Sequence, residues 1–116
     1  MVQVVVLPYF LKQLKPYAKK HRHLKDDLIQ ALEQFHPAAT DHLGNRVYKI
    51  RIRSRDLARG KSKSFRVIAL LVEIEQFLVP ITICFKGDRE SLTTGEINDH
   101  LEAALFELRR QAYMHP

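Results

Sequence analysis

The sequence is poor in cysteine, tryptophan and long apolar runs. Its 116 residues include one cysteine, Cys84, and no tryptophan. A lone cysteine cannot form an internal disulfide, which favours a reducing, cytoplasmic location. A membrane-spanning helix needs roughly 18 consecutive apolar residues, and the sequence has no such run. Met1 to Leu7 is apolar but lacks a basic leader, so it indicates a strand rather than a signal peptide.

The overall composition is typical of a globular protein. Hydrophobic residues make up 46% of the chain and charged residues 28%, values that argue against both a disordered chain and a membrane protein. A chain of this length supports one hydrophobic core and leaves little for a second. We therefore expect a single domain over residues 1–116.

The positive charge is concentrated between Arg46 and Arg66. The whole chain has 19 basic and 13 acidic residues, for a formal net charge of +6. This segment holds nine of the basic residues and one acid, Asp56, so it carries +8 and the rest of the chain −2. The nine are Arg46, Lys49, Arg51, Arg53, Arg55, Arg59, Lys61, Lys63 and Arg66. Such a local excess predicts an anionic partner, either nucleic acid or an acidic protein segment.

Alternation with period two predicts a strand from Val47 to Arg53. In a strand, Tyr48, Ile50 and Ile52 would share one face and Lys49, Arg51 and Arg53 the other. At a rise of about 3.3 Å per residue, successive cations stand roughly 7 Å apart along a rigid backbone. This spacing suits successive phosphates of a single strand of nucleic acid.

The remaining periodicity predicts the order strand, two helices, three strands and a helix. Strands are expected at Val2 to Leu7, Val47 to Arg53, Phe65 to Ile74 and Phe77 to Phe85, and helices within Pro8 to Phe35 and at Thr93 to Tyr113. This order is typical of an α+β fold with a small, mainly antiparallel sheet. We expect the first two helices to lie together on one face of that sheet.

Particular residues mark expected irregularities. Pro16 should kink or end the first helix, because proline removes a backbone donor. Pro80, inside the last strand, predicts a bulge or a sheet edge. Thr93 and Glu96 have the spacing of a capping box at the start of the last helix. The segment from Pro37 to Asn45 is expected to be a loop.

Other constellations of reactive residues are weak. Six histidines are present, but no cluster of Cys, Asp or Glu at ligand spacing accompanies them, so we expect no metal and no cofactor. Gly60, Lys61 and Ser62 resemble the end of a phosphate-binding P-loop, yet the glycine required five residues earlier is Arg55. Cys84 is expected to be a small core residue.

The cationic segment has two interpretations, protection of a sheet edge or binding of a polyanion. Nine cations against one acid exceed what edge protection needs. If the strands pair, Arg66 can lie beside Arg51 or Arg53. Lys86, at the end of the last strand, can join them. Such a cluster repels itself unless a polyanion neutralises it.

Two runs of the sequence, Gly44 to Arg51 and Gly60 to Ile68, resemble the RelE/HigB branch of the RelE/ParE toxin superfamily. The order of elements also matches that RelE-like fold. The resemblance implies the toxin of a bacterial type II toxin-antitoxin system, with a cognate antitoxin as partner. Ribonuclease members of the family cut mRNA, usually on the translating ribosome, and use no metal.

The resemblance implies an endoribonuclease, or mRNA interferase, with its site on the cationic strand. Its candidate catalytic residues are Lys49, Arg51, Arg66 and Lys86, and its candidate RNA-binding residues are Arg46, Arg53, Arg55, Arg59, Lys61 and Lys63. We expect the RNA 2′-hydroxyl to attack its own 3′-phosphate, with Lys49 as base, since neighbouring cations favour the neutral amine. Arg66 would clamp the phosphate. Arg51, Arg53 and Lys86 would position the RNA or contact the leaving group.

Two alternative functions stay open. A ParE-like toxin would have the same fold but would act by binding and poisoning a topoisomerase. That role needs no cluster of cations on the sheet. A non-catalytic RNA-binding domain would use the same cations only to contact phosphates.

Overall fold

A computed structural model describes residues 2–53, 64–85 and 92–114. Its elements are β1 Gln3–Val4, α1 Pro8–Lys20, α2 Leu24–Glu33, the short 3-10 helix η1 Pro37–Ala39, β2 Asp41–Gly44, β3 Val47–Ile52, β4 Phe65–Val72, β5 Phe77–Phe85 and α3 Thr94–Met114. Within these ranges, no helix is both long enough and apolar enough to cross a membrane.

The strands form one five-stranded sheet in the order β1-β5-β4-β3-β2. The three long strands β3, β4 and β5 are antiparallel neighbours, and only the short β1 is parallel to its neighbour β5. The expected α+β fold with a mainly antiparallel sheet is therefore confirmed.

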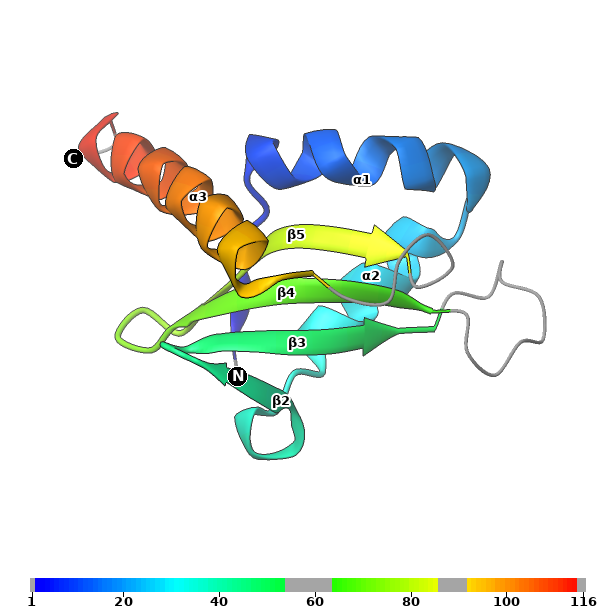
Figure 1. The fold of residues 1–116 in the computed structure, drawn as a ribbon, viewed down its shortest axis with the longest axis horizontal. Helices are drawn as coiled ribbons and strands as arrows, with labels where there is room; N and C mark the ends of the chain where they lie inside the picture. Colours follow the sequence, from blue (N-terminus) through cyan, green and yellow to red (C-terminus); the bar gives the residue numbers. More distant parts are fainter. Residues whose placement is uncertain (1, 54–63, 86–91, 115–116) are drawn as a thin grey trace.

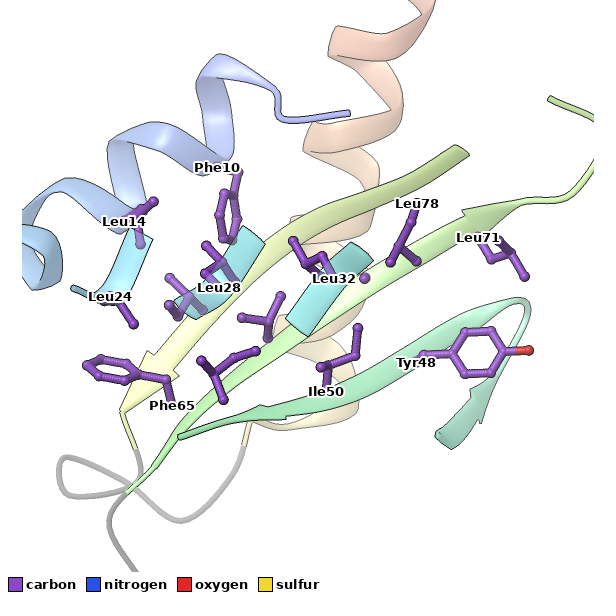
Figure 2. Close-up of a cluster of buried hydrophobic side chains, with 14 residues drawn as sticks. Phe10, Leu14, Leu24, Leu28, Leu32, Tyr48, Ile50, Phe65, Leu71 and Leu78 are labelled. Atoms are coloured by element: carbon purple, nitrogen blue, oxygen red, sulfur yellow. The ribbon is translucent and has the colours of Figure 1, made fainter. Parts of the chain in front are cut away.

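Helices cover both faces of the sheet, with α2 behind it and α3 in front in Figure 1, while α1 runs along β5. The first core lies between the sheet and the helices α1 and α2 (Figure 2). Its labelled side chains are Phe10, Leu14, Leu24, Leu28, Leu32, Tyr48, Ile50, Phe65, Leu71 and Leu78. The expectation that α1 and α2 share one face is confirmed.

A second, smaller core lies between α3 and the opposite face of the sheet. Val47, Ile68 and Val79 are buried there. The apolar stripe of α3 packs against them, with Ala104 fully buried and its neighbours half-buried. Because α3 covers only part of this face, the rest of the face is left to polar side chains.

The start of α3 is fixed by the expected capping box. The Glu96 amide donates to Thr93 Oγ1 at 3.1 Å, and the Thr93 amide donates to Glu96 Oε1 at 3.0 Å. Two backbone donors that have no partner inside the helix are thereby satisfied. The first turn of α3 thus has a defined position over the sheet.

One expectation about local structure is wrong. The segment Pro37 to Asn45 is not a loop throughout, because Asp41–Gly44 pairs with β3 as the edge strand β2. The two-residue turn that follows, Asn45 and Arg46, has positive φ at both positions, as a tight hairpin of type I′ requires.

Of the two outcomes expected at Pro16, a kink or the end of the first helix, the end is excluded, because the helix continues through Pro16 to Lys20. Leu14 before the proline and Tyr17 after it both pack against the first core. Burial on both sides of Pro16 therefore offsets the missing backbone hydrogen bond.

The bulge expected at Pro80 is confirmed. The register with β4 shifts between the pairs Ile68↔Thr82 and Ala69↔Pro80, which leaves Ile81 as the extra residue. Gln13 of α1 stabilises this irregularity, since its Nε2 donates to the Ile81 carbonyl at 2.9 Å. The Thr82 hydroxyl donates to Gln13 Oε1 at 2.6 Å. The bulge thus ties α1 to β5.

Tyr9 links α1 to α3. Its backbone amide, at the N-terminus of α1, donates to Glu107 Oε1 at 3.1 Å, and its hydroxyl lies 2.6 Å from His100 Nδ1. Partial burial, together with the carboxylates of Asp99 and Glu107, raises the pKa of the Tyr9 phenol above its ordinary value. The phenol is therefore protonated at neutral pH and can hold α3 against α1.

The packing of α1 gives a first prediction. Leu14 is 4% exposed and Leu11, on the same helix, is 42% exposed. Leu14→Ala should lower the free energy of unfolding by about 2–5 kcal/mol, whereas Leu11→Ala should lower it by at most about 1 kcal/mol. Denaturant unfolding followed by circular dichroism measures both. Equal losses in the two variants would contradict this orientation of α1.

Candidate functional site

Three cations from two neighbouring strands share one face of the sheet. Lys49 and Arg51 are two residues apart on β3, and Arg51 is the direct register partner of Arg66 on β4. Residues opposite each other in an antiparallel pair project to the same face, with Cα atoms about 4.5–5.5 Å apart. The predicted proximity of Arg51 and Arg66 is therefore confirmed. We call Lys49, Arg51 and Arg66 the cationic triplet.

The sequence pattern that produces this face is the alternation along β3. Tyr48, Ile50 and Ile52 are buried in the first core, so the residues between them must face the other way. There Arg51 is exposed, and Lys49 and Arg66 are half-buried. Like charges directly opposite each other destabilise a sheet. The direct pairing of Arg51 with Arg66 therefore favours an anionic ligand on this face.

Two hollows flank the triplet, and Lys49 and Arg66 line both of them. The β2 hollow, of about 390 Å³, is lined by Ala39, Thr40, Asp41, Lys49, Ile50, Arg51 and Arg66. The α3 hollow, of about 400 Å³, lies between the sheet and the first turns of α3. An anion held between Lys49 and Arg66 would therefore have a binding cavity on either side.

An acidic residue that sequence reasoning missed also reaches this site. Asp41 on β2 is the register partner of Lys49 and lines the β2 hollow with Arg51 and Arg66. The sequence predicts a loop from Pro37 to Asn45, and this prediction leaves Asp41 out of the site. The turn residues Gly44 and Asn45 before a strand are the signal that could have indicated a hairpin partner.

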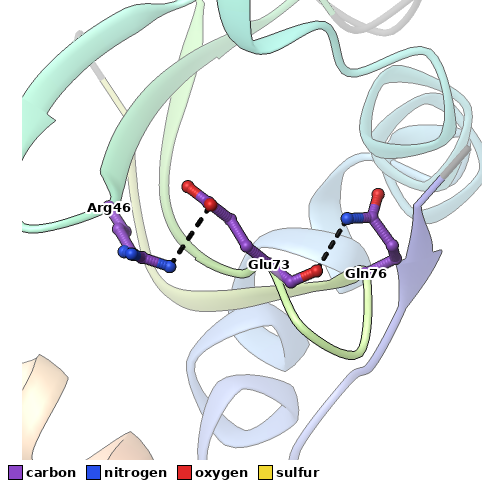
Figure 3. A network of polar contacts seen from close by, with 3 residues as sticks. All are labelled: Arg46, Glu73 and Gln76. Atoms are coloured by element: carbon purple, nitrogen blue, oxygen red, sulfur yellow. Dashed lines mark hydrogen bonds and ion pairs between the residues drawn. The ribbon is translucent and has the colours of Figure 1, made fainter.

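Arg46, which was predicted to bind RNA, lies at the other end of β3. At about 3.3 Å per residue it stands roughly 16 Å along the strand from Arg51. Its Nη1 is 3.4 Å from Glu73 Oε2, and the Gln76 side chain donates to the Glu73 carbonyl at 2.7 Å (Figure 3). The two partners of this ion pair are 58% and 54% exposed, so it adds little stability.

The other predicted site residues are distributed as follows. Arg53 is exposed and comes directly after the end of β3, on the side of the triplet away from Arg46. Five predicted residues lie outside the part of the chain that the structure describes: Lys86, Arg55, Arg59, Lys61 and Lys63. Their roles stay predictions.

The fold and the cationic triplet together define a small α+β protein with a basic sheet face partly covered by its last helix. A family model described as the RelE toxin of the RelE/RelB toxin-antitoxin system matches residues 9–112. The chain therefore belongs to the RelE toxin family. Membership implies an antitoxin as partner; the assignment to the HigB branch stays a prediction.

Among solved structures, one similar chain is a double mutant of the E. coli toxin RelE in the free state. It is 17% identical, with 71% of this chain and 80% of that chain covered and a TM-score of 0.47. The comparison with curated proteins gives no match.

The different surroundings of Arg51 and Arg46 give a second prediction. Arg51→Ala should weaken binding of single-stranded RNA and reduce the steepness of its salt dependence by about 0.7 in log K against log salt. Arg46→Ala removes the same charge but should leave that slope nearly unchanged, because Arg46 is paired with Glu73 far from the triplet. Fluorescence anisotropy at several salt concentrations measures both slopes. Equal slopes of log K against log salt for the two variants would show that Arg51 contributes no more to RNA binding than Arg46 does.

Proposed function

We propose that this RelE-family chain is a metal-independent endoribonuclease that cleaves mRNA on the translating ribosome, and hence acts in the cytoplasm. The observation that carries the proposal is the cationic triplet, which gathers Lys49, Arg51 and Arg66 on one open face. Lys49, half-buried beside the Arg51–Arg66 pair, brings a group that can exchange a proton next to two groups that can bind a phosphate.

The first step is binding of one RNA phosphate between Arg51 and Arg66. Guanidinium groups present fixed pairs of N–H donors that match the oxygens of a phosphate. Two arginines brought together by strand register can hold one phosphate without further movement of the backbone. The bound phosphate would neutralise the charge repulsion between them.

The second step is attack of the RNA 2′-hydroxyl on the neighbouring phosphorus. Its proton must pass to a base, and of the triplet only Lys49 can exchange a proton, because arginine remains protonated in proteins. The two arginines then stabilise the charge that develops on the phosphorane oxygens. The 5′-oxygen leaves with a proton taken from water, Lys49 returns its proton to water, and the products are a 2′,3′-cyclic phosphate and a 5′-hydroxyl.

The contacts to the leaving group are assigned to Arg53 and Lys86. Arg53 comes directly after β3 and is exposed, so it can reach RNA that extends beyond the triplet. Lys86, which follows β5 in the sequence, keeps its predicted role. Asp41, opposite Lys49, is assigned to positioning the Lys49 amine.

The proton-transfer role of Lys49 gives a third prediction. Lys49→Arg keeps the positive charge but cannot accept a proton, so mRNA cleavage on programmed ribosomes should fall by about 10²–10⁴-fold. RNA affinity should change less than about threefold, since the charge that contacts phosphate is retained. Single-turnover cleavage and anisotropy measure the two quantities.

Two variants complete the experiment on Lys49. Lys25→Arg, an exposed position on α2, is the matched control and should cleave like the wild type. Asp41→Asn removes the carboxylate opposite Lys49 but keeps a side chain that can hydrogen-bond to the amine, so it should keep most of the cleavage. Cleavage by Lys49→Arg at the wild-type rate would show that Lys49 is not the base.

The alternative functions differ from the proposal in measurable ways. A ParE-like toxin would leave transcripts intact and cause DNA breaks in expressing cells. A non-catalytic RNA-binding domain would bind RNA and yield no cyclic phosphate ends. The lysine in the triplet favours the nuclease over both, because neither alternative needs a residue that exchanges a proton.

The antitoxin gives a fourth prediction. Arg51→Ala combined with Arg66→Ala should abolish growth inhibition by the chain expressed alone, since both phosphate contacts are lost. Co-purification with the antitoxin should persist, because buried apolar contacts dominate most protein interfaces. Growth curves and pull-down from co-expressing cells measure these effects.

The control for charge is Arg109→Ala combined with Arg110→Ala, two exposed arginines on α3. This variant loses the same net charge and should stay as inhibitory as the wild type. Full growth inhibition by the folded Arg51/Arg66 variant would show that the triplet is not the active site.

A further inference from the structure

The α3 hollow has a chemical character different from that of the β2 hollow on the other side of the triplet. Its floor is formed by Val47 and Ile68 of the sheet, and Leu101 of α3 forms part of its wall. At about 400 Å³ it has the size of a small-molecule site, and such sites combine apolar walls with a few placed polar groups.

The polar side chains that line the α3 hollow but not the β2 hollow are uncharged. Asn45, Thr94 and Asn98 line the α3 hollow, and all three are exposed at its mouth. Side-chain amides both donate and accept hydrogen bonds. Among the described residues that line it, the only charged ones are Lys49 and Arg66, which the hollow shares with the triplet.

These features suit a flat, neutral group covalently attached to a phosphate. The aliphatic side chains offer apolar contact to the two faces of a ring, and the amides of Asn45 and Asn98 can pair with the polar edge of a base. The shared cations place the attached phosphate at the entrance of the hollow.

We propose that the α3 hollow binds one nucleobase of the RNA, next to the phosphate bound at the cationic triplet, and that Asn98 helps select this base. The inference rests on the proposed function and adds a specificity site to it. No aromatic side chain lines the hollow within the described residues. Base preference therefore arises from hydrogen bonds to the amides, more than from stacking.

The first experiment removes the base and fills the hollow. Synthetic mRNAs carry a single abasic nucleotide at each position around the cleaved bond, and cleavage on programmed ribosomes is measured for each. One abasic position should reduce kcat/KM of the wild type on the order of tenfold, the effect of losing one base contact. Leu101→Phe, which occupies part of the hollow, should reduce cleavage of intact mRNA and show no further loss at that abasic position.

Leu105→Phe is the matched control for Leu101→Phe. Leu105 belongs to the same helix and packs in the same second core, but it does not line the hollow. This variant should retain the full abasic effect of the wild type. Thermal unfolding of both variants shows whether each of them is folded.

The second experiment needs no change in the core. Asn98 is exposed, so Asn98→Ala should fold, keep cleavage of the best substrate within about tenfold, and broaden the preference at one nucleotide. Gln111→Ala, which removes an exposed amide from the same helix, should leave the preference unchanged. Sequencing of cleavage ends from a randomised mRNA library measures the preference.

The outcomes separate this inference from the proposed function. Abasic losses that are equal in the wild type, Leu101→Phe and Leu105→Phe, with the Asn98→Ala preference unchanged, would overturn the base site and leave the nuclease intact. A Leu101→Phe variant with normal cleavage but weaker antitoxin binding would assign the hollow to the antitoxin and would also overturn it. Absence of cleavage by the wild type would refute the nuclease itself, and the base site with it.

Discussion

The pairing of Arg51 with Arg66 across β3 and β4 places two positive charges directly opposite each other on a sheet. Like charges in that arrangement oppose strand pairing, so the pairing must be held by something else. The opposite face holds it, because Ile50, Ile52 and Val67 are buried in the first core. Apolar burial under α1 and α2 thus forces the cations together.

The last helix decides how much of the cationic face is available. Its apolar stripe covers Val47, Ile68 and Leu70. The capping box at Thr93 fixes where the helix begins, and the contacts of Tyr9 with Glu107 and His100 hold the helix against α1. The uncovered remainder contains the triplet, with a hollow on each side. The proposed site therefore lies at the border of a covered apolar patch, where the cations would hold the phosphate of a nucleotide and the α3 hollow its base.

Much of this arrangement can be predicted from sequence, because local periodicity encodes it. Alternation alone separates Tyr48 and Ile50 from Lys49 and Arg51, and the spacing of Thr93 and Glu96 indicates the start of α3. The Arg51–Arg66 pairing follows once the two strands are expected to be neighbours.

The parts that the sequence could not predict depend on tertiary contacts. β2 is a strand of four exposed residues, and it is extended because β3 pairs with it, so Asp41 was missed. α1 continues through Pro16 because both flanks are buried. Asn98 gave no signal, since its place beside the triplet depends on how α3 crosses the sheet.

If the cationic face is kept for a polyanion, its charge repulsion should lower the folding stability of the free protein. The most direct measurement is the free energy of unfolding of Arg51→Gln against wild type, at low and at high ionic strength. The account predicts that the variant is more stable at low salt, by a few tenths to about 1 kcal/mol, and that salt reduces the difference by screening. A variant that is less stable than wild type at every salt concentration would contradict it.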